Sequence, residues 1–128
     1  MNKLDKESVI GISALLVHAA NIDEIYSDHE KDLVKDFIKS YLKNEDASKI
    51  LEEAEQIENN SNQLLNYTNV IKKNSLEIKK DIIEHLWRVI ISDNSVDQYE
   101  ANLMRRICGL IYFPDKECAE IKLKLLNS

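Results

Sequence analysis

Apolar residues recur at intervals of three and four along almost the whole chain, and this spacing is the strongest constraint on its fold. Such spacing places apolar side chains on one face of a helix. The 128 residues include only two glycines and one proline, too few for the turns and bulges of a sheet protein. We therefore predict an all-α fold of about seven helices in a single domain, residues 1–128. The predicted apolar stripes begin at Val9, Leu33, Ile50, Leu64, Ile78, Leu103 and Cys118. The third stripe comprises Ile50, Leu51, Ala54 and Ile57.

Helix-end signals separate these stripes. Ser27 is followed three residues later by Glu30, which is the layout of a capping box. Asp97 and Glu100 repeat this layout with an aspartate as the cap residue, and the segment 74–77 gives a third example. These signals predict that helices begin near residues 28, 75 and 98.

The chain contains an internal repeat. When the sequence is shifted by 70 residues, Asp23 falls on Asp93, and the glutamate seven residues after each aspartate matches as well. Any two amphipathic helices align to some extent, but the shared offsets of the aspartate, the cap residue and the glutamate are not explained by periodicity alone. We interpret the chain as two pseudo-symmetric helix–loop–helix halves, at roughly residues 8–42 and 76–112.

Composition narrows the classes of function. The net charge is −6, with 23 acidic and 17 basic residues, which disfavours binding to nucleic acid. The two cysteines, Cys108 and Cys118, do not have the spacing of a zinc site and are interpreted as small core residues. The longest apolar stretch covers residues 9–20, too short to span a membrane. The N-terminus lacks the features of a secretory signal, so we expect a cytoplasmic protein.

The most specific motif lies in the second half. Residues 86–100 read LWRVIISDNSVDQYE, and residues 103–107 read LMRRI. This segment resembles the TerB-like family, whose hallmark is roughly L-W-x-[VI]-x-x-[AS]-D-G-x-[IV]-[DS]-x-x-E before an apolar helix. LLVHAANID at 15–23 and YSDHE at 26–30 look like the first copy of the same motif. The resemblance covers roughly residues 8–126.

The TerB-like family includes the bacterial tellurite-resistance protein TerB and helical domains found with some J-domain co-chaperones. The resemblance implies an all-α fold of two pseudo-symmetric halves, an acidic surface, a role in stress response and no known catalytic activity. Where the family usually has Asp-Gly, this chain has Asp-Glu at 23–24 and Asp-Asn at 93–94. Asparagine adopts the left-handed backbone more readily than glutamate, so the second loop is the one expected to keep the family shape.

Carboxylates gather at the two predicted loop–helix junctions, and family members carry such a cluster as candidate metal ligands. Carboxylate oxygens suit Ca²⁺ or Mg²⁺. The second loop is not an EF-hand, because Gln98 and Met104 occupy positions where that motif needs Gly and Glu. Helix capping and loop shape alone are the competing explanation for these acids. The candidate ligands are Asp23, Glu30, Asp93, Asp97 and Glu100.

Two further features bear on partners. Trp87, the single tryptophan, is expected either to pack in the core or to anchor a protein partner. Lysines at 72, 73, 79 and 80 form a basic run, interpreted as a solvated helix face, with an anionic partner or membrane headgroups as the alternative.

Two hypotheses of function remain. The first is a non-enzymatic TerB-like module in a bacterial stress or tellurite-resistance response, with cation binding at the acidic junctions. The second is a protein-interaction scaffold or co-chaperone-type regulatory domain without a metal. No catalytic residue is predicted, because the sequence has no nucleophile–base pair, cofactor loop or zinc motif.

Overall fold

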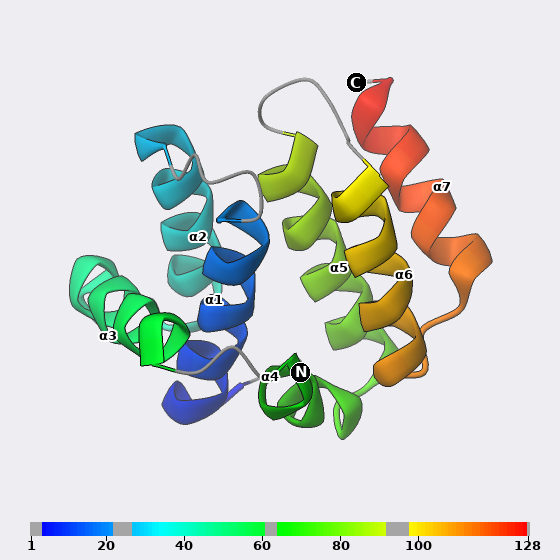
Figure 1. The fold of residues 1–128 in the computed structure, drawn as a ribbon. Coiled ribbons are helices and arrows are strands. Elements are labelled where there is room, and N and C mark those ends of the chain that lie inside the picture. The colour runs from blue at the N-terminus through cyan, green and yellow to red at the C-terminus, as the bar shows by residue number, and fades with distance from the viewer. Residues whose placement is uncertain (1–3, 22–26, 61–63, 92–97, 128) are drawn as a thin grey trace.

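The structure, a computed structural model, describes residues 4–21, 27–60, 64–91 and 98–127, with side chains described except at 64–67 and 98–100. These residues form seven α-helices and no β-strand (Figure 1), which confirms the predicted all-α fold. The helices are α1 (Lys6–Ala20), α2 (Asp28–Tyr41), α3 (Ala47–Asn60), α4 (Leu64–Lys72), α5 (Leu76–Ile91), α6 (Gln98–Leu110) and α7 (Asp115–Leu126).

The first helix is the centre of the fold. Asp5 caps it by accepting a hydrogen bond from the amide of Ser8 at 2.7 Å. Helix α1 then packs against α2, α3, α4 and α5, so most of its circumference is covered. This explains why its sequence is apolar on nearly every side rather than along one stripe. Its buried residues are Val9, Ile12, Ser13, Ala14, Leu15, Leu16, Val17, Ala19 and Ala20.

The remaining helices complete one shared core. Helices α1 and α2 run antiparallel, as do α5 and α6, and α7 returns alongside α5 and α6 (Figure 1). Buried apolar side chains from all seven helices form one cluster. The pseudo-symmetry of the two halves stays a prediction. Within the described ranges, no helix is both long enough and apolar enough to cross a bilayer.

Helix starts agree with the sequence to within about one residue. Helix α2 begins directly after Ser27, as predicted. Helix α5 begins one residue later than the motif at 74–77 indicates, because Ser75 is the cap residue and accepts from the amide of Ile78 at 3.3 Å. The Asn74 side chain instead donates to the carbonyl of Val70 at 2.7 Å, so it closes the end of α4.

Candidate functional site

Glu30 is the one predicted cation ligand whose side chain the structure describes. The amide of Glu30 donates to Oγ of Ser27 at 3.2 Å, which is the first half of the capping box. The amide and the hydroxyl of Ser27 both donate to Oε1 of Glu30, at 2.9 and 3.0 Å. The side chain is buried, with 7% exposed. Its Oε1 oxygen is therefore engaged in fixing the start of α2.

The other four predicted ligands lie outside what the structure describes. Asp23, Asp93 and Asp97 fall in undescribed segments, and Glu100 lies in α6 with an undescribed side chain. The helices that flank these segments do share one end of the bundle: α1 and α5 finish there, and α2 and α6 begin there (Figure 1). Among the described side chains, no three His, Cys, Asp or Glu residues gather as a metal site requires.

A buried glutamate that sequence reasoning missed lies beside the end of α1. Glu58 of α3 is only 8% exposed. Its Oε1 lies 3.4 Å from Nδ1 of His18, and its Oε2 accepts from the side-chain amide of Asn21 at 3.3 Å. The signal was present in the sequence, since Glu58 lies seven residues after Leu51 and so falls on the apolar face of α3. This contact ties α3 to the last turn of α1.

A second polar group joins α2 to α5. The hydroxyl of Tyr41 donates to Oδ2 of Asp81 at 2.6 Å, and Nε2 of His85 lies 3.7 Å from Oδ1 of the same carboxylate. Burial, helped by Asp81, raises the pKa of Tyr41 above its usual range, so the phenol stays a neutral donor. Burial lowers the pKa of His85, and its ring packs edge-on against Phe37. The group cross-links two core helices.

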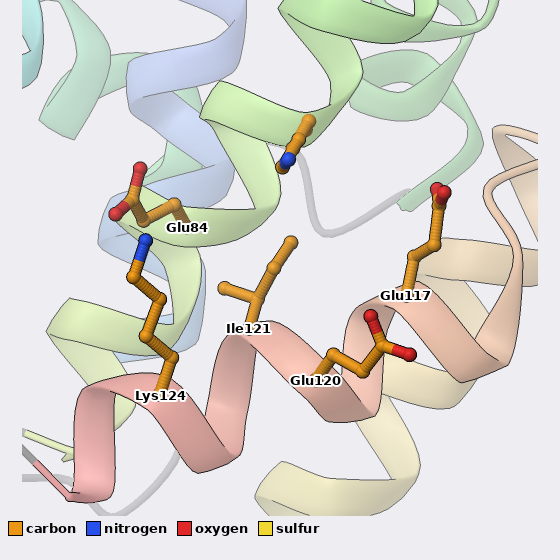
Figure 2. Close-up of a pocket in the computed structure, with 6 residues that line it drawn as sticks. Glu84, Glu117, Glu120, Ile121 and Lys124 are labelled. Atoms are coloured by element: carbon orange, nitrogen blue, oxygen red, sulfur yellow. The ribbon is translucent and has the colours of Figure 1, made fainter.

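A groove of about 200 Å³ separates α5 from α7 (Figure 2). In the close-up, the Lys124 side chain points toward Glu84, and Ile121 points between the two helices. Glu84 also accepts a hydrogen bond from Arg88 at 3.3 Å. Three glutamates and two lysines line this groove, so it has no strong preference for a ligand of one charge. Its lining residues are Lys80, Glu84, Glu117, Glu120, Ile121 and Lys124.

Trp87 lies in the core between α5 and α7, with 4% of its surface exposed. Its indole N–H donates to Sγ of Cys118 at 3.3 Å. The Lys122 ammonium lies over the ring, 5.4 Å from its centroid. These contacts account for the residue as an internal packing element, and a role in partner binding stays a prediction.

In the part of the chain that the structure describes, the arrangement of the helices defines the class of protein as an all-α bundle in which four helices pack around α1. Residues 10–123 match the family model described as Tellurite resistance protein TerB. The match spans most of the chain, so this protein belongs to the TerB family. Comparisons with curated proteins and with solved structures gave no match.

Proposed function

We propose that this chain is a non-enzymatic TerB-type module of a bacterial stress response of the tellurite-resistance kind. We further propose that it works in the cytoplasm with protein partners and binds Ca²⁺ or Mg²⁺ at its acidic junctions. Family membership supports the general role. The observation that carries the cation site is that α1 and α5 end, and α2 and α6 begin, at one end of the bundle (Figure 1).

The five candidate ligands are not equally available to a cation. Glu30 already satisfies the start of α2 through Oε1, so a cation there would compete with the helix cap. We therefore assign the main part of the proposed site to Asp23, Asp93, Asp97 and Glu100. Hard carboxylate oxygens favour Ca²⁺ and Mg²⁺ over softer metals.

Thermal unfolding tests this proposal directly. A cation that binds only the folded chain with a Kd of about 1 mM adds about 1.4 kcal/mol at 10 mM, by mass action. For a chain of 128 residues this corresponds to a rise in Tm of about 5 °C relative to EDTA. Failure of both Ca²⁺ and Mg²⁺ to shift Tm would refute the cation site, and leave the interaction scaffold to be tested by pull-down.

Matched double variants locate the effect. Asp93→Asn with Glu100→Gln should abolish the cation-dependent rise in Tm. Glu52→Gln with Glu53→Gln changes the charge equally at two exposed positions of α3 and should retain the rise. Equal loss in both double variants would mean that the cation acts through general charge screening rather than at a site.

A further inference from the structure

The two cysteines of the chain come together at the turn between α6 and α7. Cys108 lies in α6 and Cys118 in the second turn of α7, and both are buried, with 0% and 6% exposed. The largest influence on the pKa of each cysteine is hydrogen bonding with the other thiol. The two thiols, ten residues apart in the sequence, therefore lie near one another in the fold.

The backbone of the turn explains how the two thiols come near one another. The amide of Phe113 donates to the carbonyl of Cys108 at 2.8 Å, and the amide of Tyr112 donates to Gly109 at 3.4 Å. Tyr112 has a left-handed backbone with φ of 60°. Together these features form a Schellman ending, which reverses the chain tightly after α6. Helix α7 then starts at Asp115 and packs against both α5 and α6.

The environments of the two thiols differ. Cys118 receives the indole N–H of Trp87 at 3.3 Å, and Lys122 lies one helical turn further along α7. The hydrogen bond with Cys108, followed by the Trp87 donor and the Lys122 charge, lowers the pKa of Cys118 to about 7 against opposing effects of burial and Asp115. The same thiol–thiol bond and burial raise the pKa of Cys108. Cys118 is thus the member that carries the thiolate.

Cys118 is also the member that a small reagent can reach. It lines a surface cavity of about 520 Å³ together with Trp87, Met104, Arg105 and Lys122. Arg105 and Lys122 add two positive charges to this lining and Asp115 adds one negative charge, so the lining carries a net positive charge. A thiolate that is stabilised by donors and cations and opens onto a cavity has the setting of reactive cysteines, whereas an inert structural cysteine lacks such access.

We propose that Cys108 and Cys118 form a reversible redox dithiol, in which Cys118 reacts from the cavity with a peroxide and Cys108 then closes a disulfide. In the first step, the Cys118 thiolate attacks one peroxide oxygen and the O–O bond breaks. Sulfur loses two electrons to the peroxide, and the departing hydroxide takes a proton, giving a sulfenic acid and water. In the second step, Cys108 attacks that sulfur, the S–O bond breaks, and the hydroxide leaves as water with the Cys108 proton.

Intact-mass spectrometry of the full chain tests the proposal, with hydrogen peroxide as the probe and EDTA present. The wild-type chain should lose two hydrogen masses and regain them with dithiothreitol. Cys108→Ser should gain one oxygen and react with dimedone at Cys118, whereas Cys118→Ser should stay unmodified over the same time. Equal oxidation of the two single variants, a stable oxygen adduct on the wild-type chain, or disulfide-linked dimers would each overturn it.

Alkylation kinetics test the positioning of the thiolate without an oxidant. In Cys108→Ser, where the hydroxyl still donates, Cys118 at pH 7 should react about 3-fold faster than a thiol with the ordinary pKa of about 8.5. A lowered pKa of about 7 raises the thiolate fraction about 16-fold, and the lower basicity reduces the nucleophilicity of the thiolate about 5-fold. Trp87→Phe and Lys122→Gln, each added to that variant, should slow the reaction and move its midpoint to higher pH. Lys124→Gln removes a charge from the same helix, but in the groove between α5 and α7 that Glu84 and Ile121 line. It should change neither the rate of alkylation nor its pH midpoint. A midpoint at ordinary thiol pH, or equal effects of the two lysine variants, would contradict the assigned roles.

Discussion

Substitution of Ser27 and Glu30 measures how much the capping box at the start of α2 contributes to the free energy of unfolding. Ser27→Ala removes the acceptor of the Glu30 amide, which should lower the free energy of unfolding by about 1 kcal/mol. Glu30→Ala removes the acceptor at 2.9 Å from the Ser27 amide and a negative charge at the start of α2, with an expected loss of about 1–2 kcal/mol. For 128 residues, a loss of about 1.5 kcal/mol lowers Tm by about 5 °C.

Urea denaturation followed by far-UV circular dichroism gives these values, with EDTA in every sample. The double variant should lose less than the sum of the single losses, because the two side chains share the same hydrogen bonds. Glu53→Ala, at an exposed position of α3, is the control and should stay within about 0.5 kcal/mol of wild type. If Glu30→Ala loses less than about 0.5 kcal/mol in EDTA, or loses stability only when a cation is present, the capping interpretation is wrong.

Three further substitutions probe other parts of the molecule. Ser13→Ala should raise the free energy of unfolding by about 1 kcal/mol in urea, because among the described residues Ser13 Oγ is buried without a hydrogen-bond partner; a loss would contradict this. Burial lowers the pKa of His85, so protonation favours the unfolded chain and stability falls as pH drops below about 6.5. His85→Gln should flatten that slope in denaturation series from pH 7 to 5, whereas the exposed control His29→Gln should keep it; equal slopes would count against the assignment. Tyr112→Gly should gain about 0.5–1 kcal/mol in thermal unfolding by relieving a left-handed backbone, and lower stability would show that the Tyr112 ring contributes more than the strain costs.

Local chemistry was the predictable part of this fold. The Ser27–Glu30 capping box needs only residues within one turn, and it forms as predicted. The apolar spacing likewise predicts the helices, since burying one face requires no knowledge of the partner. Asn74 shows that even local prediction has a limit. Its side chain could cap the start of α5 or bond to the end of α4, and in the structure it donates to the carbonyl of Val70.

Contacts between distant residues were not predictable from spacing. The third apolar stripe assigned Ile57 to the core, yet Ile57 is 39% exposed while its neighbour Glu58 is 8% exposed. Glu58 can be buried because His18 and Asn21 supply partners from α1, about 40 residues earlier. The proximity of the cysteines similarly depends on the α6–α7 turn, which spacing alone does not reveal. Of the five predicted cation ligands, only the Glu30 side chain lies within the described part of the chain.

The burial of α1 on nearly every side bears on how the chain matures during synthesis. Its covering helices include α5, which ends at Ile91. Until the α5 segment has left the ribosome, the hydrophobic helix α1 lacks one of the helices that cover it in the folded protein. The chain therefore reaches its full stability only after α5 has been synthesised. Fragments released after α3 or α4 should aggregate or be degraded.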